Sequence, residues 1–278
     1  MVRIITDSVS DLAPEVAEDL GIAVVPLIVR FGTESFQDGV DLTNEQFYER
    51  LKNSPVLPVT SAPTPGAFAE TCDRLAEETD EIAIITVSSR LSATRDVARQ
   101  GVELMKRRCR VEVVDSRCGA MAEGFVAIKA AEAGRAGAGL DEVAETACRT
   151  VPRASIFAAF ETLEYLRKGG RIGAAQALLG SVLKVNPIIA LKDGVVVPAG
   201  RARSRRKALD RLFEYAAAYS RVEELAVEDA ACPDEAEALA QRLGSAFPGV
   251  RIHRSHTTPV IGTHTGPGLL VVAVLGDS

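Results

Sequence analysis

Short apolar runs alternate along this chain with longer segments whose apolar residues recur at helical spacing. The clearest example is the run 82–87, which lacks polar alternation and ends at a cluster of hydroxyls. Such a run is typical of a strand that is covered on both faces in a parallel sheet. Residues 94–107 follow with apolar positions at helical spacing. The pattern predicts a buried strand that leads into a helix, with Ser92 as the N-cap.

The first half of the chain repeats this order of strand and helix. Regular alternation of this kind predicts a parallel sheet with helices on both faces. The predicted strands cover residues 2–6, 23–31, 82–87 and 111–114. The predicted helices cover residues 14–20, 44–53, 67–78, 94–107, 120–133 and 140–150, and residues 58–65 are expected to form a rigid loop.

The pattern changes near Val151-Pro152. Asp193-Gly194, between two apolar runs, predicts a hairpin, which a purely parallel sheet does not need. We therefore expect an α/β protein of two domains: a parallel α/β/α domain over residues 1–153, and an α+β domain with a mainly antiparallel sheet over 154–278. The strands of the second domain are expected at 155–160, 184–191, 195–197, 224–227, 250–253 and 269–274, and its helices at 163–168, 174–183, 204–219 and 234–246.

Composition narrows the class of protein. Of the 278 residues 47% are hydrophobic and 25% charged, which is ordinary for a soluble globular protein with a sizeable core. The formal net charge of −6 and the absence of Trp argue against nucleic acid as a partner. Residues 1–12 lack a signal-peptide core, and the apolar run 269–275 is far shorter than the roughly 20 residues of a membrane span. We expect a cytoplasmic protein without stable membrane insertion.

Several familiar cofactor signals are missing from the sequence. The five cysteines are scattered and include no C-x-x-C pair, so neither a disulfide framework nor a zinc site is indicated. The three histidines have no carboxylate or cysteine at a familiar ligand spacing, and we expect no metal. Neither G-x-G-x-x-G nor G-K-[ST] occurs, which disfavours a dinucleotide and a P-loop. The prediction is therefore a protein without a cofactor.

Hydroxyl groups recur where predicted strands end. Residues 88–92 contain three serines, Asp7-Ser8 and Asp115-Ser116 close two other strands, and Thr60-Ser61 lies in the rigid loop. Parallel sheets bind ligands at the carboxyl ends of their strands, and a helix N-terminus favours an anion. These groups could together hold one carboxylate or phosphate. Equally, they could only satisfy the backbone of their own loops.

Three later segments have both a functional and an ordinary explanation. Arg171 follows two glycines and could lie over an anion, or could be a surface residue after a helix stop. His264, in the loop 263–268, could be functional or a solvated turn residue. The run 201–207 places five basic residues at the start of a helix, where cations cost stability, so it indicates an acidic partner or a solvated face.

Taken together and in order, these motifs closely resemble the DegV family. The resemblance covers nearly the whole chain, although Ala93 and Arg95 stand where the family usually has glycine and an aromatic residue. It is carried by Ile5-Thr6-Asp7-Ser8, Thr60-Ser61-x-Pro63, Ser88-Ser89-x-Leu91-Ser92, Asp115-Ser116, Leu163-Glu164-Tyr165-Leu166-x-Lys168-Gly169-Gly170-Arg171-Ile172, Pro187-Ile188 and Gly262-Thr263-His264-Thr265-Gly266-Pro267-Gly268.

The resemblance implies a two-domain protein that carries a long-chain fatty acid in a tunnel between its domains. Some members of the family are the acyl-binding subunit of a bacterial fatty acid kinase, in which a separate ATP-dependent subunit phosphorylates the carboxylate that they present. By that resemblance Thr60, Ser61, Ser92 and Ala93 are expected at the fatty acid carboxylate. Arg171, Arg203, His264 and Thr265 are expected near the head group or facing the partner kinase. No catalytic residue is implied for this chain.

Two other functions remain open from the residues. A serine hydrolase or esterase would use Ser92 as nucleophile and His264 as base, with Asp7 or Asp115, although G-x-S-x-G is absent. A lipid-sensing regulatory protein would use the basic run 201–207. Apolar residues such as Leu163, Leu178 and Leu183 could line a lipid tunnel or simply form core.

Overall fold

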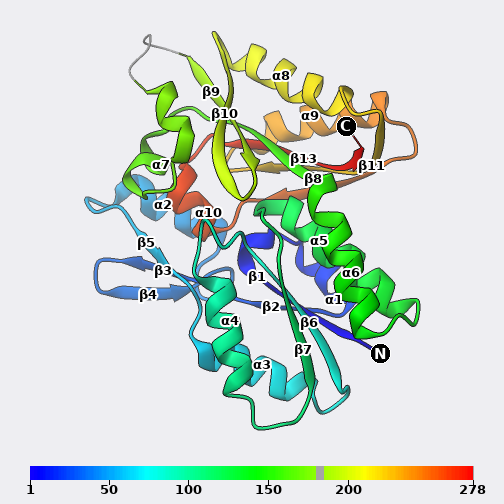
Figure 1. Ribbon diagram of the computed structural model, residues 1–278. Coiled ribbons are helices and arrows are strands. Elements are labelled where there is room, and N and C mark those ends of the chain that lie inside the picture. Colours follow the sequence, from blue (N-terminus) through cyan, green and yellow to red (C-terminus); the bar gives the residue numbers. More distant parts are fainter. Residues whose placement is uncertain (180–184, 278) are drawn as a thin grey trace.

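The structure is a computed structural model that describes residues 1–179 and 185–277. Its lower half in Figure 1 contains a four-stranded sheet in the order β2-β1-β6-β7. All three pairings in this sheet are parallel, as the alternation of strands and helices predicts. The four strands are β2 (Ile22–Val25), β1 (Arg3–Asp7), β6 (Glu81–Thr86) and β7 (Arg110–Asp115).

Strand β6 is buried on both faces, which explains its continuous apolar sequence. Ile82 and Ile84 pack against α3 and α4, while Ala83 and Ile85 pack in a separate cluster that includes α5 and α6. Helices therefore cover both faces of the parallel sheet, as predicted. The helices of this half are α1 (Pro14–Leu20), α2 (Asn44–Asn53), α3 (Pro65–Leu75), α4 (Thr94–Glu103), α5 (Ala120–Arg135) and α6 (Leu140–Thr150).

A three-stranded antiparallel sheet at the left of Figure 1 differs from the prediction. The segment 23–31, predicted as one strand, divides at Pro26, whose missing N–H cannot continue the ladder. Its second part pairs with the predicted rigid loop, where Thr60 lies opposite Val29. The sheet has the order β4-β3-β5 and consists of β3 (Ile28–Phe31), β4 (Glu34–Gln37) and β5 (Val59–Ser61).

The upper half of Figure 1 is a six-stranded sheet in the order β10-β9-β8-β13-β11-β12. Every pairing is antiparallel except that of β11 with β12. The predicted hairpin is confirmed, and its turn at Asp193-Gly194 has positive φ at both residues. The strands are β8 (Ala154–Ala159), β9 (Asn186–Lys192), β10 (Val195–Ala202), β11 (Arg221–Asp229), β12 (Arg251–His256) and β13 (Leu270–Asp277).

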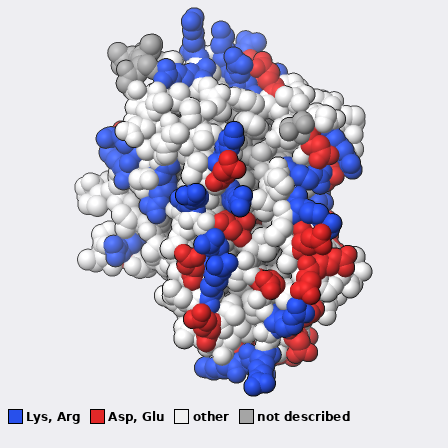
Figure 2. Space-filling view, viewed as in Figure 1, with Lys and Arg blue, Asp and Glu red and all other residues white. Residues whose placement is uncertain are grey.

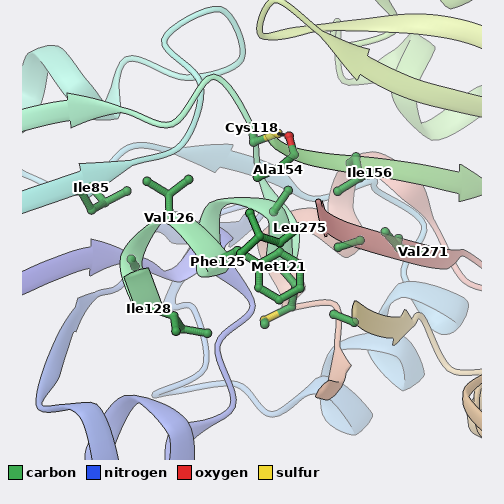
Figure 3. Packing of buried hydrophobic residues seen from close by; sticks show 14 of the residues in the cluster. Ile85, Cys118, Met121, Phe125, Val126, Ile128, Ala154, Ile156, Val271 and Leu275 are labelled. Carbon is green, nitrogen blue, oxygen red and sulfur yellow. Dashed lines mark hydrogen bonds between the residues drawn. The ribbon is translucent and has the colours of Figure 1, made fainter. Parts of the chain in front are cut away.

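Helix α5 lies between the two large sheets and joins them into one core (Figure 3). Phe125 and Met121 lie beside Leu275 of the six-stranded sheet, and Val126 lies beside Ile85 of the parallel sheet. The outer face of the six-stranded sheet is covered by α8 and α9. The later helices are α7 (Glu164–Lys168), α8 (Arg205–Ala217), α9 (Pro233–Ala246) and α10 (Pro259–Thr265).

Three local predictions are wrong. Helix α4 has Ala93 at its N-cap and no side-chain cap, because the Ser92 hydroxyl bonds Thr94 Oγ1 at 2.8 Å instead. The predicted loop at 263–268 begins inside α10, so His264 lies on a helix. The helix predicted over 174–183 is a 3-10 helix, η3 (Gly173–Leu178), and the rest of that prediction, with Leu183, lies outside the described residues.

Candidate functional site

An apolar cavity of about 890 Å³, a volume that includes space open to solvent, lies between the six-stranded sheet and the loops of the first half of the chain. The described residues that line it are apolar or glycine except for Thr60, Ser61, Ser92, Arg171, His264 and Thr265. Its apolar walls include Ile156, Ala158, Phe160, Ile189, Leu191, Val196 and Val271 from the six-stranded sheet and the loop after β8, and Val9, Leu27, Val87 and Leu91 from the first half.

His264 and Thr60 meet at the polar part of this wall. Thr60 Oγ1 and His264 Nε2 are 2.8 Å apart, while His264 Nδ1 is buried without a partner among the described residues. Burying an acceptor nitrogen without a partner costs less free energy than burying an N–H without one. We therefore assign the proton to Nε2, which donates to Thr60. This tautomer leaves the Thr60 hydroxyl hydrogen available for a ligand oxygen.

Burial keeps His264 uncharged. It lowers the pKa of His264 to about 4 from its usual 6.5, and the nearby positive charge of Arg171 acts in the same direction. The ring is therefore neutral near pH 7 and acts as a hydrogen-bonding group rather than as a fixed cation.

Arg171 ties together two of the loops that carry predicted site residues. Its Nε donates to the Leu91 carbonyl at 3.2 Å, and its Nη1 donates to the Gly169 carbonyl at 2.7 Å. The serine loop itself is closed by the Ser88 carbonyl, which accepts from the Ser92 N–H at 3.1 Å. Ser92 is thus held beside an exposed guanidinium at the cavity wall.

The structure brings most, but not all, of the predicted site residues to the cavity. Thr60, Ser61, Ser92, Arg171, His264 and Thr265 line its wall. Ala93 and Arg203 are not among the residues that line it in the described part of the chain, and Arg203 is exposed after β10. The fatty acid roles expected for these residues stay predictions.

The acids at the strand ends shape the loops instead of lining the cavity. Asp7 accepts from the Val87 N–H at 2.8 Å and from the Val9 N–H at 3.0 Å, so it joins the ends of β1 and β6. Asp115 accepts from the Ser89 N–H at 3.2 Å. Burial raises the pKa of Asp7 to about 7. These carboxylates therefore hold the loop segments that carry the wall residues Val9, Val87 and Leu91.

Sequence reasoning assigned no individual role to two residues that contact α10, Gly169 and Asp38. Gly169 leaves room for the histidine ring, since a methyl group there would overlap His264 Nδ1. Asp38 is buried and accepts from the Val260 N–H at the start of α10 at 3.1 Å. The only sequence signal for Asp38 is a carboxylate followed by glycine, which is common in turns.

The geometry does not favour a serine hydrolase. Ser92 bonds Thr94, and His264 bonds Thr60, whereas a catalytic triad needs the serine on one ring nitrogen and a carboxylate on the other. Asp7 and Asp115, the two acids considered for that role, bond backbone amides elsewhere. Among residues 1–179 and 185–277, no group of three or more His, Cys, Asp or Glu is arranged to hold a metal ion.

Comparison with known proteins agrees with this architecture. The family model described as "Uncharacterised protein, DegV family" matches residues 1–277. The chain belongs to the DegV family. A DegV domain-containing protein of Streptomyces coelicolor is 42% identical over 98% of both chains.

Solved DegV structures share the fold over almost their full length. A fatty acid binding DegV family protein from Thermus thermophilus superposes with a TM-score of 0.91 at 29% identity, with 99% of each chain covered. DegV of Bacillus subtilis, a fatty acid binding protein, gives a TM-score of 0.90 at 30% identity, also over 99% of each chain. In the described part of the present chain, no helix has the length and apolar character needed to span a membrane.

Proposed function

We propose that this protein binds a long-chain fatty acid, with the acyl chain in the apolar cavity and the carboxylate at Thr60, Ser92 and His264. The observation that carries the proposal is the composition of the cavity wall, in which only six of the lining side chains from residues 1–179 and 185–277 are polar. The DegV proteins of T. thermophilus and B. subtilis, which bind fatty acids, have the same fold and support it.

The cavity suits a ligand that gains its affinity from its tail. Each buried methylene contributes roughly 0.8 kcal/mol, so a long acyl chain gains on the order of 10 kcal/mol before the costs of binding. A hydrogen bond to a charged group adds only about 1.5–3 kcal/mol. The apolar wall therefore supplies affinity, and the hydroxyls supply orientation.

The head group would be held by neutral donors. With Nε2 of His264 donating to Thr60, the Thr60 hydroxyl turns its hydrogen toward the ligand, and Ser92 supplies a second hydroxyl beside it. Arg171 adds positive charge at the same end of the cavity, where it remains exposed. A carboxylate fits this set because it accepts hydrogen bonds and carries the opposite charge.

The finer proposal is that the protein presents this carboxylate to a separate ATP-dependent kinase subunit and has no catalytic residue of its own. In that reaction a carboxylate oxygen forms a bond to the γ-phosphorus of ATP, the bond from that phosphorus to ADP breaks, and an acyl phosphate results. Exposed Arg171 and Arg203 would face the kinase, and Lys and Arg side chains gather over α8 at the top of Figure 2. The two proposed domains, 1–153 and 154–278, would enclose the tail between them.

Native mass spectrometry of the purified protein, followed by extraction of the ligand, tests the binding proposal. We expect a bound long-chain fatty acid, or uptake of hexadecanoate by delipidated protein. Protein that is repeatedly empty and takes up no fatty acid would contradict the proposal.

The kinase proposal has a separate test. Arg171→Ala and Arg203→Ala should retain the lipid but slow its ATP-dependent phosphorylation by the partner kinase. Loss of the lipid in both variants, with normal turnover of the remaining complex, would show that the role assignment is wrong.

A further inference from the structure

The helix that carries His264 is capped by side chains from distant parts of the chain. Helix α10 follows Thr258, whose own side chain makes no capping bond to the first turn. Instead Asp38 Oδ1 accepts from the Val260 N–H at 3.1 Å, and Asp11 Oδ1 accepts from the Thr258 N–H at 3.0 Å. Two carboxylates therefore hold the start of α10.

Asp38 is itself fixed by the first half of the chain. Its Oδ2 accepts from the Ser8 hydroxyl at 2.7 Å, and Ser8 Oγ in turn accepts from the Leu27 N–H at 3.1 Å. Asp38 is 3% exposed, and Ser8 is also buried. Each carboxylate oxygen of Asp38 thus accepts a hydrogen bond. Through these bonds Asp38 links the ends of β1 and β2 to α10.

The same helix lines the cavity from its first turn onward. Val260, Ile261, His264 and Thr265 of α10 line the cavity, and His264 meets Thr60 of β5 there. Because α10 has only seven residues, a shift of its first turn moves His264 with it. Burying a carboxylate costs free energy unless its oxygens accept hydrogen bonds. Asp38 meets this condition through the Val260 N–H and the Ser8 hydroxyl.

We propose that Asp38 is a positioning residue for the head-group site: through the first turn of α10, it holds His264 against Thr60. This inference rests on the proposed function, since it assigns the residue that sets the geometry of the fatty acid site. Asp38 touches no ligand atom in this account, and its effect on binding passes through α10.

The test uses three variants of the full chain. Asp38→Ala removes the acceptor, whereas Asp38→Asn keeps one oxygen for the Val260 N–H and places an amide group toward Ser8. Asp41→Ala is the matched control, because exposed Asp41 bonds the Gln37 N–H of the same loop and, among the described residues, forms no hydrogen bond with α10. If Asp38→Ala does not fold, Asp38→Ser, with its shorter polar side chain, replaces it.

The first measurement needs no ligand. The ring protons of the three histidines are titrated by NMR, and His264 is assigned by its loss in His264→Gln. In Asp38→Ala, or in Asp38→Ser if it replaces that variant, the pKa of His264 should rise from about 4 toward 6.5 as the ring leaves Thr60 and gains solvent. Asp38→Asn and Asp41→Ala should titrate like the wild type. A change in global stability alone would not move the pKa of the folded state.

The second measurement compares two probes with the same tail. Asp38→Ala, or Asp38→Ser in its place, should weaken binding of hexadecanoate about tenfold and leave hexadecanol unchanged, since only the acid needs the head-group geometry. An unchanged His264 titration in the folded variant, an equal loss for both probes, or an Asp38→Asn variant as impaired as Asp38→Ala would overturn the inference. Wild-type protein that fails to bind hexadecanoate would contradict the proposed function instead, and the titration would still decide the role of Asp38.

Discussion

Filling the cavity with a larger side chain should exclude the acyl tail without harming the fold. Ala158 on β8 is the best place, because its side chain is buried and faces the cavity. Ala158→Leu adds three carbon atoms to the space that the tail would occupy. If each displaces about one methylene, the loss is ~2.4 kcal/mol, or about 50-fold in affinity for hexadecanoate.

The control is Ala190→Leu on the neighbouring strand. Ala190 is half-buried and pairs with Phe157, whose side chain packs on the opposite face of the sheet, away from the cavity. Both variants are delipidated, titrated with hexadecanoate by calorimetry, and compared in thermal unfolding. Ala158→Leu should be at least as stable as wild type when empty, because it fills empty space with apolar atoms. Wild-type affinity in Ala158→Leu, or an equal loss in Ala190→Leu, would refute the assignment of this cavity to the tail.

Three further predictions concern the polar end of the cavity. Gly169→Ala should displace the His264 ring and weaken hexadecanoate binding about tenfold in the same titration, whereas Gly139→Ala, where the added methyl meets open space, should have no effect. Because the pKa of His264 is about 4 in the folded protein and about 6.5 in the unfolded chain, the unfolded state takes up this proton first, so the contribution of His264 to stability should fall by up to about 3 kcal/mol between pH 6.5 and 4, whereas buried carboxyls with a raised pKa, such as Asp7, act in the opposite direction. In urea unfolding, the stability of His264→Gln relative to wild type should rise as the pH falls over this interval, and a difference that does not change with pH would contradict the assignment. A serine-reactive phosphonate should leave Ser92 unlabelled, because the Ser92 hydroxyl bonds Thr94 and His264 bonds Thr60 instead of this serine. Stoichiometric labelling, detected by intact mass, would support the hydrolase alternative.

The local sequence determined those helices and strands whose terminal backbone groups are hydrogen-bonded by residues nearby in the sequence. Helix α1 ends where Gly21 adopts a positive φ, as its sequence predicts. The capping box of Thr43 and Gln46 begins α2, with both reciprocal bonds present. The apolar run of β6 predicted its burial on both faces. In these cases the hydrogen bonds and periodicity lie within a few residues, where sequence inspection can find them.

Only the tertiary structure decided the features that depend on distant partners. The end of helix α10 was predicted as part of the loop 263–268, because the amides at the start of this helix are satisfied by Asp38 and Asp11, which lie more than 200 positions away. Strand β5 was predicted as a rigid loop because its partner β3 is remote in sequence. The family resemblance selected Thr60, Ser92 and His264, but the contact of His264 with Thr60 joins residues 204 positions apart. Sequence fixes which groups need a partner; the packing of the two sheets around α5 determines which partner each one meets.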